Sequence, residues 1–554
     1  MSADLDPQLS HRQGEAGPPL PERTVGADLA RTAWAFPEGE ALVERASGRR
    51  WTYAELDAAV DDLARGLLAA GVETGDRVGI WSPNCAEWVL SQYAAARAGA
   101  ILVNLNPAYR AHEIGYTLRQ SGTKLLIAAT RVKNSDYVAL IESVRADCPA
   151  LERVVHIGTP GWDALVAEGR AVPLERLRER EAGLTPEDPA NIQYTSGTTG
   201  FPKGATLSHR NILGNGFQVA EVQGWTEADR VCLPVPFYHC FGMVMGNLGA
   251  VSHGSCIVVP GALFDPVETL DAVQAERCTV LYGVPTMFIA ELAQLEAAPE
   301  RWDLSSLRTG AMAGSPCPVE VMKRVMGDMG MAEVTIAYGM TETSPVSTQT
   351  RRTDSLEHRV ATVGQVHPHV EIKVVDPQTG ATLPTGTPGE LCTRGYSVML
   401  GYWDDPERTA EAVDPDGWMH TGDLAEMAAD GYVSIVGRIK DMVIRGGENV
   451  YPREVEEFLY SHPDIEDVQV VGVPDPRYGE ELMAWVKLRP GAPELTVDQL
   501  RAFCAGRLAH FKVPRYLHLV DGFPMTVTGK IRKVQMREES VELLGGSSDG
   551  VTPS

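Results

Sequence analysis

The chain has 554 residues and a formal net charge of −25, and 44% of its residues are hydrophobic, which is ordinary for a globular protein. This length exceeds that of one ordinary domain, so several core units are expected. The strong negative charge argues against a nucleic-acid partner, whose phosphates the protein would repel.

The N-terminal segment and the cysteines restrict the cellular setting. Residues 1–22 are polar and rich in proline and glycine, without the apolar segment of a signal peptide, so we expect residues 1–23 to be a disordered tail. No apolar run reaches about 18 residues, so no integral membrane segment is expected. The nine cysteines form no CxxC pair and no metal-ligand spacing. We expect buried free thiols and a cytoplasmic protein.

Predicted helices and strands alternate through the first third of the chain. Residues 52–55 form a capping box, and apolar residues at helical spacing follow it. A second helix is predicted through residues 88–96. Short apolar strands are predicted at residues 77–81, 101–104, 124–128 and 154–157. This alternation is typical of a doubly wound α/β sheet, in which ligands bind at the carboxyl ends of the strands.

The C-terminal part of the chain changes character twice. The segment from about residue 362 to 435 is rich in glycine and short strands, which predicts a β-rich subdomain. Beyond a boundary at residues 438–441 the pattern is that of a compact α/β unit, with Pro452 at the start of a helix and a capping box at residues 496–499. The predicted ranges are 24–437 for a large N-terminal domain of doubly wound sheets, 442–540 for a small α/β C-terminal domain and 541–554 for a disordered tail.

The strongest local pattern lies at residues 194–204, directly after a predicted strand. It combines three glycines, four serine or threonine hydroxyls and Lys203. Glycine lets the backbone approach a ligand closely, and successive N–H groups and hydroxyls can then surround an anion. The pattern therefore predicts a phosphate-binding loop. It is not a Walker A loop, because Lys203 lies between Pro202 and Gly204.

In its order of residues this loop resembles the phosphate loop of the adenylate-forming superfamily, which contains acyl-CoA synthetases, firefly-type luciferases and peptide-synthetase adenylation domains. The match spans about residues 24–540 and includes Tyr-Gly-Met-Thr-Glu at 338–342, Thr-Gly-Asp at 421–423 and Gly-Lys at 529–530. The resemblance implies ATP, CoA and a small carboxylic acid as substrates and Mg²⁺ as cofactor. It also implies that the small C-terminal domain is mobile and rotates about a hinge at Lys440.

The resemblance assigns most of the nucleotide site. It places the phosphates at Thr195, Ser196, Gly197, Thr198, Thr199, Gly200 and Lys203, the adenine at Gly314, Ser315, Pro316, Ala337, Tyr338, Gly339 and Met340, and the ribose at Asp423 and Arg438. Thr341 would contact phosphate, and Glu342 would hold Mg²⁺, which prefers carboxylate oxygen. Lys530 would bridge the substrate carboxylate and the α-phosphate, where its charge matters most as negative charge builds in the transition state.

The second half of the implied reaction uses another face of the small domain. There the CoA thiol attacks the acyl adenylate, after pyrophosphate has left, and AMP is released. The resemblance assigns the CoA tunnel to Arg445, Gly446, Gly447 and Glu448. The two glycines make physical sense, because a pantetheine arm must pass close to the backbone.

The acyl pocket is assigned to residues that are mostly apolar or small: His239, Phe241, Met245, Tyr282, Val284, Met312, Ala313 and Gly339. His239, which alone would be an ordinary loop histidine, is also assigned to catalysis. Flexible methionines suit a carbon chain. The strings at residues 104–109, 281–288 and 444–452 resemble those of the medium-chain fatty acyl-CoA synthetase branch, so we predict a medium-chain fatty acid:CoA ligase.

Several alternatives stay open at the level of sequence. Aryl, branched or sterol-side-chain acids are alternatives to a medium-chain fatty acid. A luciferase-like oxygenase, or a stand-alone adenylation protein that feeds a carrier protein, would share the same motifs. An amino-acid substrate is disfavoured, because the aromatic loop at residues 237–241 has no Asp or Glu to bind an ammonium group. The sequence leaves open whether the protein is a homodimer and whether Lys530 is regulated by acylation.

Overall fold

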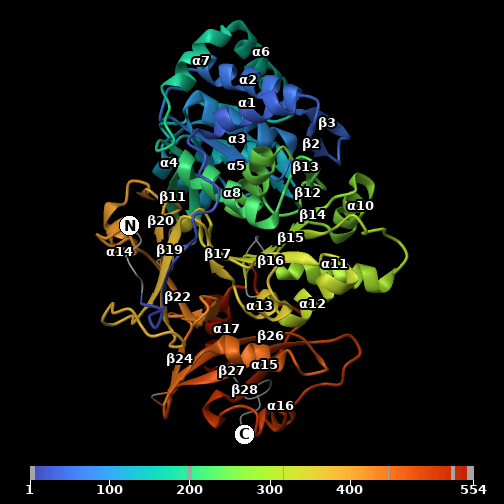
Figure 1. Ribbon diagram of the computed structural model, residues 1–554, viewed down its shortest axis with the longest axis vertical. Coiled ribbons are helices and arrows are strands. Elements are labelled where there is room, and N and C mark those ends of the chain that lie inside the picture. Colours follow the sequence, from blue (N-terminus) through green and yellow to red (C-terminus); the bar gives the residue numbers. More distant parts are fainter. Residues whose placement is uncertain (1–5, 196–201, 316, 447, 526–530, 546–554) are drawn as a thin grey trace. The chain divides into compact units, whose positions relative to one another are not determined.

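The computed structural model describes residues 6–195, 202–315, 317–446, 448–525 and 531–545 (Figure 1). The chain forms two compact units. The large unit comprises Arg12–Ile372 and Cys392–His420, and the small unit comprises Met1–His11, Lys373–Leu391 and Thr421–Ser554. Strands and helices alternate in both, so the α/β fold class predicted from the sequence is confirmed.

A seven-stranded sheet of the large unit carries Lys203 near one edge. Its strand order is β21–β11–β10–β5–β4–β6–β9, and the strands from β10 to β9 pair in parallel. The strands are Arg77–Trp81 (β4), Ile101–Asn104 (β5), Thr123–Ala128 (β6), Arg153–His156 (β9), Pro189–Thr195 (β10), Lys203–Ser208 (β11) and Gly401–Tyr402 (β21). The four early strands predicted from the sequence are β4, β5, β6 and β9, and every residue of β5 is buried, as expected between two layers of helices.

A nine-stranded sheet of the large unit has the order β18–β17–β16–β15–β14–β12–β13–β2–β3, and the strands from β16 to β2 pair in parallel. The strands are Glu40–Glu44 (β2), Arg49–Thr52 (β3), Arg230–Cys232 (β12), Cys256–Val259 (β13), Val280–Gly283 (β14), Thr309–Ala313 (β15), Glu333–Gly339 (β16), Val346–Gln349 (β17) and Gln365–Val366 (β18). Because parallel neighbours end at the same edge, the residues that follow β14, β15 and β16 gather where ligands bind in open α/β sheets.

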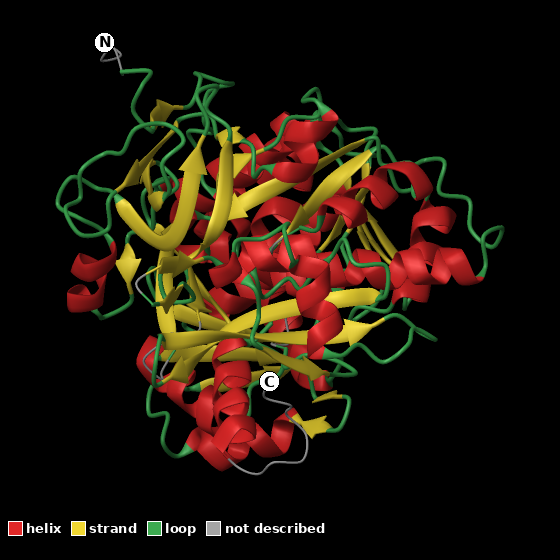
Figure 2. Cartoon of the chain, turned by 90° about the horizontal axis from the view of Figure 1, so that it is seen from below, coloured by secondary structure: helices red, strands yellow, loops and turns green. Residues whose placement is uncertain are grey.

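Helices cover these sheets, and Figure 2 shows them in red against the yellow strands. They are Val25–Ala35 (α1), Tyr53–Ala69 (α2), Ala86–Ala98 (α3), Ala111–Ser121 (α4), Tyr137–Arg145 (α5), Pro160–Ala171 (α6), Leu174–Ala182 (α7), His209–Gln223 (α8), Gly249–His253 (α9), Pro266–Glu276 (α10), Pro285–Ala297 (α11), Val319–Asp328 (α12), Leu356–Ala361 (α13) and Pro406–Ala412 (α14), with a short hairpin of Arg131–Val132 (β7) and Ser135–Asp136 (β8). The predicted capping box opens α2: Thr52 Oγ1 accepts from the Glu55 backbone N–H at 3.2 Å, and Glu55 Oε2 accepts from the Thr52 N–H at 2.9 Å.

Arg97 of α3 is the centre of a buried charge network. Its side chain has no exposed surface, and a guanidinium tolerates that only when it is paired. It donates to the carboxylates of Asp57 and Asp61 on α2, and its Nε lies 3.4 Å from Glu181 Oε1 on α7. Arg178 of α7 reaches Asp61 at 2.5 Å. The network thus ties α2, α3 and α7 together.

Strand β1 (His11–Gln13) lies in the segment that was expected to be a disordered tail, and that expectation is wrong for these residues. β1 is the edge strand of a five-stranded sheet in the order β1–β19–β20–β22–β23. The other strands are Val370–Val375 (β19), Gly389–Gly395 (β20), Met419–Met427 (β22) and Val433–Arg438 (β23). Edge pairing uses backbone groups, so a polar segment can add a strand without an apolar pattern.

The C-terminal part of the small unit forms a sheet in the order β25–β24–β27–β26, with β28 beside β27. Its elements are Val443–Arg445 (β24), Glu448–Val450 (β25), Pro452–Leu459 (α15), Ile465–Asp475 (β26), Gly479–Leu488 (β27), Val497–Cys504 (α16), His510–Lys512 (η3), Tyr516–Leu519 (β28) and Lys533–Gly545 (α17). Pro452 opens α15 and Thr496 caps α16, as predicted. The tail expected from residue 541 is wrong as far as Gly545, because Leu543 and Leu544 pack against a buried cluster around Trp485.

The structure also bears on the predictions about the cysteines and about membrane-crossing segments. All nine cysteines are free, and eight of them are buried. Within the described ranges, no helix has both the length and the apolar character that a bilayer crossing requires.

Candidate active site

The hairpin of β10 and β11 carries the two ends of the predicted phosphate loop. The strands pair antiparallel, and Thr195 is opposite Lys203 at the end of the hairpin. Both residues therefore lie at the carboxyl end of β10, the edge where ligands bind in sheets of this kind. The intervening candidates lie outside the described residues: Ser196, Gly197, Thr198, Thr199 and Gly200.

Glu342 is joined directly to this hairpin. It lies in the short helix η2 (Thr341–Thr343) after β16, and 4% of its surface is exposed. Its Oε1 accepts a hydrogen bond from Thr195 Oγ1 at 3.2 Å and another from Tyr402 Oη at 2.8 Å. Mg²⁺ prefers hard oxygen ligands and is commonly held in nucleotide sites by one or two carboxylates together with phosphates. A buried carboxylate beside hydroxyls at the phosphate-loop hairpin therefore fits a Mg²⁺ ion.

Tyr402 belongs to the same cluster, although the sequence analysis did not select it. Its ring centroid lies 4.4 Å from Lys203 Nζ, and its hydroxyl donates to Glu342. Burial, with the Glu342 carboxylate nearby, raises the pKa of Tyr402 above its usual value, so the hydroxyl stays protonated and donates. Tyr402 reaches the hairpin because β21 pairs with β11, where Ala205 is its partner.

The candidate adenine residues gather at the carboxyl edge of the nine-stranded sheet. Those within the described residues are Gly314, Ser315, Ala337, Tyr338, Gly339 and Met340. Gly314 and Ser315 follow β15, and Tyr338 and Gly339 end β16, its parallel neighbour. A Cβ at Gly339 would lie 1.8 Å from the carbonyl oxygen of Pro345, so only glycine fits this turn of the chain.

His239 lies in the loop before η1 (Phe241–Leu248), close to the Glu342 helix. Its Nδ1 accepts a hydrogen bond from the backbone N–H of Phe241 at 3.2 Å. An Nδ1 that accepts leaves the ring proton of a neutral imidazole on Nε2. Cys240 Sγ lies 3.9 Å from Thr341 Oγ1, which joins this loop to η2. The structure therefore brings His239 and Thr341 into the neighbourhood of Glu342.

The helix that follows His239 is a π-helix, and all of its residues are buried. Met243 Sδ accepts from Asn104 Nδ2 at 3.2 Å and lies 3.6 Å from Gln193 Nε2. These two amides stand on β5 and β10, so η1 is held against the seven-stranded sheet. π-Helical turns are rare and occur mostly at functional sites.

Five of the candidate acyl-pocket residues share one apolar cluster. They are Phe241, Met245, Tyr282, Val284 and Ala313, and all are buried. The rings of Phe241 and Tyr282 stack with centroids 5.3 Å apart and an interplanar angle of 30°. An aromatic wall of this kind suits an apolar substrate.

The side-chain amide of Gln223 accepts a hydrogen bond from Tyr282 of that wall. Tyr282 Oη donates to Gln223 Oε1 at 3.3 Å, and Trp225 Nε1 donates to the same oxygen at 3.0 Å. The Trp225 ring lies 5.6 Å from the Tyr282 ring. Gln223 and Trp225, which no sequence pattern selected, thus fix the orientation of Tyr282.

Met312 does not belong to this wall. In the parallel pair β14–β15, Tyr282 is opposite Ala311 and Gly283 is opposite Met312. Side chains alternate between the two faces of a sheet, so Met312 points away from the face that carries Tyr282. The register therefore separates Met312 from the Tyr282 wall, and its assignment to the acyl pocket stays a prediction.

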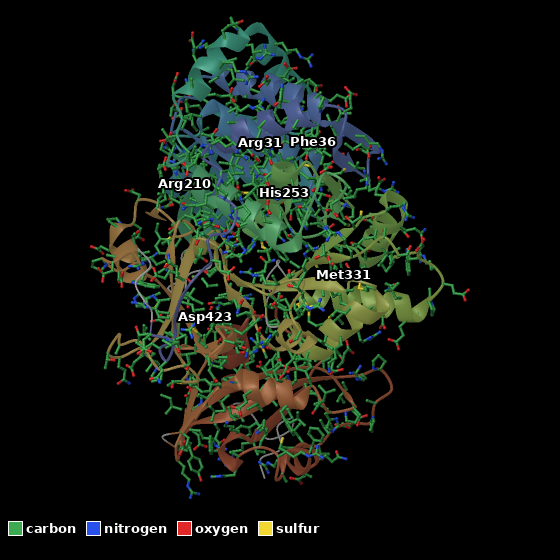
Figure 3. The ribbon with its side chains drawn as sticks, viewed as in Figure 1. Arg31, Phe36, Arg210, His253, Met331 and Asp423 are labelled. Atoms are coloured by element: carbon green, nitrogen blue, oxygen red, sulfur yellow. The ribbon has the colours of Figure 1, made fainter. Side chains whose placement is uncertain are left out.

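The candidate ribose residues form a pair within the small unit. Asp423 on β22 is opposite Arg438 on β23, and Arg438 Nε donates to Asp423 Oδ1 at 2.9 Å. Figure 3 labels Asp423 on the orange part of the ribbon. Its side chain is 11% exposed, whereas that of Arg438 is 69% exposed. A carboxylate oriented in this way can accept hydrogen bonds from neighbouring hydroxyls.

The candidate CoA residues lie on the hairpin of β24 and β25. Arg445 is opposite Glu448, and Gly446 has a φ of +61° in the turn between them. The Arg445 guanidinium is engaged inside the unit: Nη1 donates to the carbonyl oxygen of Phe511 and Nη2 to Glu481 Oε1, each at 2.8 Å. Arg445 therefore joins the hairpin to the segment around Phe511 and to β27, and the Gly446 N–H donates to the Tyr478 carbonyl oxygen at 2.8 Å.

Four candidate residues remain, one at the predicted hinge and three outside the described residues. Lys440, the predicted hinge, lies in a turn where the Asp441 N–H donates to the Arg438 carbonyl oxygen at 3.0 Å. Pro316, Gly447 and Lys530 lie outside the described residues.

Comparison with known proteins matches most of the chain to one enzyme family. Models described as "AMP-binding enzyme" and "AMP-binding enzyme C-terminal domain" match residues 29–403 and 454–530. "Putative acyl-CoA synthetase YngI" of Bacillus subtilis is 47% identical over 95% of this chain and 98% of its own length. "Medium-chain acyl-CoA ligase ACSF2, mitochondrial" of Danio rerio is 44% identical over 97% of this chain and 91% of its own.

Solved structures resemble the chain over nearly its whole length. The anthranilate CoA ligase AuaEII in complex with anthranoyl-AMP has a TM-score of 0.85 at 28% identity, and the alignment covers 95% of this chain and 99% of that one. ATP-bound MatB from Rhodopseudomonas palustris has a TM-score of 0.80 at 30% identity, with 94% and 99% covered.

Proposed function

The chain belongs to the AMP-binding enzyme family as an acyl-CoA synthetase, and from this premise we propose that it is an ATP-dependent ligase of medium-chain fatty acids and CoA. In the first step the acid's carboxylate oxygen attacks the α-phosphorus of ATP, and pyrophosphate leaves. In the second step the CoA thiolate attacks the acyl carbon, and AMP leaves with the bonding electrons. One observation carries this proposal: Thr195, Lys203 and Glu342 converge beside the loop that leads into an apolar, aromatic cluster.

The roles within the first step follow from charge. We propose that Lys203 and Thr195 bind the ATP phosphates, and that Glu342 holds Mg²⁺, which neutralises phosphate charge when bound. Positioned charges of this kind supply most of the rate in phosphoryl chemistry. Lys530 is proposed to bridge the carboxylate and the α-phosphate, and Asp423 with Arg438 to bind the ribose.

The choice of a medium-chain acid rests on the apolar residues of the proposed pocket and on the named relatives. Phe241, Met245 and Tyr282 present apolar surface, and each methylene buried there contributes about 0.8 kcal/mol. The relative named as a medium-chain acyl-CoA ligase supports a linear acid. An aryl acid is a second candidate, because Phe241 and Tyr282 stack as an aromatic wall and the neighbour AuaEII is named as an anthranilate CoA ligase.

We further propose that CoA meets the turn between β24 and β25, and that the enzyme works in the cytoplasm. Nine free cysteines support a reducing compartment. Glycine at this turn supports the proposal, because it lets a pantetheine arm pass close to the backbone.

Pyrophosphate release tests the proposal. Purified protein is mixed with ATP, Mg²⁺ and linear acids of increasing length, aryl acids or amino acids, with and without CoA. A maximum at medium-chain acids with turnover that requires CoA supports the proposal. Preference for an aryl acid selects the second candidate. Turnover that is indifferent to CoA points instead to an oxygenase or a carrier-protein partner.

A further inference from the structure

Tyr402 contacts both charged groups of the proposed phosphate site at once. Its hydroxyl donates to Glu342 Oε1 at 2.8 Å, and the face of its ring lies 4.4 Å from Lys203 Nζ. Its exposed fraction is 7%, so the ring and the hydroxyl are largely shielded from water, whereas Lys203 is partly exposed. Tyr402 therefore lies between the Lys203 ammonium and the Glu342 carboxylate. In the proposed reaction these two groups bind different partners, phosphate and Mg²⁺.

The backbone around Tyr402 fixes this position. β21 pairs with β11, and the Trp403 N–H donates to the Gly204 carbonyl oxygen at 2.7 Å. The Tyr402 N–H donates to Oγ1 of Thr409, in the middle of α14, at 2.9 Å. These hydrogen bonds of the Tyr402 and Trp403 backbone fix the position of the ring. They do not depend on the contacts that the ring and its hydroxyl make.

An ammonium and a carboxylate in a shielded site attract each other strongly. An ion pair between Lys203 and Glu342 would therefore occupy the phosphate ligand and the metal ligand together. In the part of the chain that the structure describes, Lys203 has no carboxylate partner, and its ammonium lies over the Tyr402 ring instead. A π face attracts a cation more weakly than a carboxylate does, so phosphate can displace it.

We propose that Tyr402 is a positioning residue that keeps Lys203 and Glu342 apart in the enzyme without nucleotide. The ring holds the ammonium, and the hydroxyl and Thr195 hold the carboxylate oxygen. The proposal rests on the proposed function, because it assigns Lys203 to phosphate and Glu342 to the metal. It makes Tyr402 act on ATP through these two residues and gives it no contact with the acid.

Two substitutions separate the two contacts. Tyr402→Phe removes only the hydroxyl and keeps the ring, so the affinity for ATP in EDTA should stay within about twofold of the wild type. The KM for Mg-ATP should rise about tenfold, because the charged Glu342 carboxylate loses a hydrogen bond. Tyr402→Leu also removes the π face, so the ion pair forms and the affinity for metal-free ATP, measured by calorimetry, falls about tenfold or more. The KM for the acid stays unchanged in both. Tyr53→Phe is the matched control, because Tyr53 is also buried and its hydroxyl donates to the Ser255 carbonyl oxygen at 2.7 Å, away from this site.

A double variant gives the decisive result. Adding Glu342→Gln to Tyr402→Leu removes the partner of the ion pair, so metal-free ATP affinity should return to within about threefold of the wild type. An unchanged metal-free affinity in Tyr402→Leu, or no recovery in the double variant, overturns the proposal. If Tyr402→Leu does not fold, equal loss of metal-free and Mg-ATP binding in Tyr402→Phe overturns it instead. If the wild type itself binds no ATP, the proposed function fails, and that outcome is separate from the one tested here.

Discussion

Shortening Tyr282 should change which acids the enzyme accepts. Tyr282 is fully buried, stacks on Phe241 at 5.3 Å and is held from behind by Gln223. In Tyr282→Leu the ring is lost from the wall that faces the proposed acyl chain. A longer acid can then extend into the space that the ring filled.

The magnitude follows from the burial of methylenes. Two further methylenes in that space gain about 1.6 kcal/mol, which is roughly a 15-fold change in kcat/KM for the longer acid relative to the shorter one. The same change costs stability, because truncating a buried aromatic residue typically costs about 3–5 kcal/mol for alanine and less for leucine. For that reason Tyr282→Leu is a better probe than Tyr282→Ala.

The assay compares kcat/KM over a series of linear acids in the wild type, Tyr282→Leu and Tyr282→Phe. The ratios between acids report the pocket, and a uniform loss of activity cancels from them. Tyr282→Phe keeps the ring and loses only the bond to Gln223, so its chain-length profile should match the wild type. If Tyr282→Leu lowers activity by one factor for every acid, Tyr282 does not limit the pocket.

Three further predictions concern catalysis and stability. Lys530→Ala should abolish most acid-dependent pyrophosphate release but spare thioester formation from a supplied acyl adenylate, and equal loss in both half-reactions would contradict its assigned role. Burial lowers the pKa of His209 to about 4, so the unfolded state binds the proton first as pH falls below about 6.5. Stability should therefore fall by roughly 2 kcal/mol from pH 7 to pH 5, and His209→Gln should reduce this slope in denaturant titrations; an unchanged slope would show that other groups cause it. Arg97→Met removes the buried cation that Asp57, Asp61 and Glu181 share and should cost roughly 3–5 kcal/mol, whereas Arg145→Met, at an exposed pair, should cost less than about 1 kcal/mol. Similar unfolding midpoints for these two variants would refute the argument.

Helices and strands with a clear apolar periodicity or a capping box could be predicted from the sequence. The strands around Val78 and Val103 and the helix capped by Thr52 follow from apolar periodicity and from one capping box, and the structure confirms them. The fold class follows from their alternation. The phosphate-loop string selected Thr195 and Lys203, and the structure places these two residues opposite each other on β10 and β11.

Long-range pairing decided what the sequence could not predict. Tyr402 stands on a strand of two residues, too short for any periodicity, and meets Lys203 only because β21 pairs with β11 about 200 residues earlier in the chain. The face on which Met312 lies depends on the register between β14 and β15, which no local pattern reveals. Arg97 gave no signal, because a charged residue in a helix is usually exposed, and its three acidic partners come from two other helices.

The wide turn of η1 gives the acyl pocket an unusual route of divergence. A π-helix holds more residues per turn than an α-helix, so deleting one residue between Phe241 and Leu248 would let the segment close as an α-helix while the flanking chain keeps its phase. The side chains on one side of the deletion would move by one position, and a different side chain would stand where Met245 meets Phe241. A new substrate range could thus arise from the loss of a single codon.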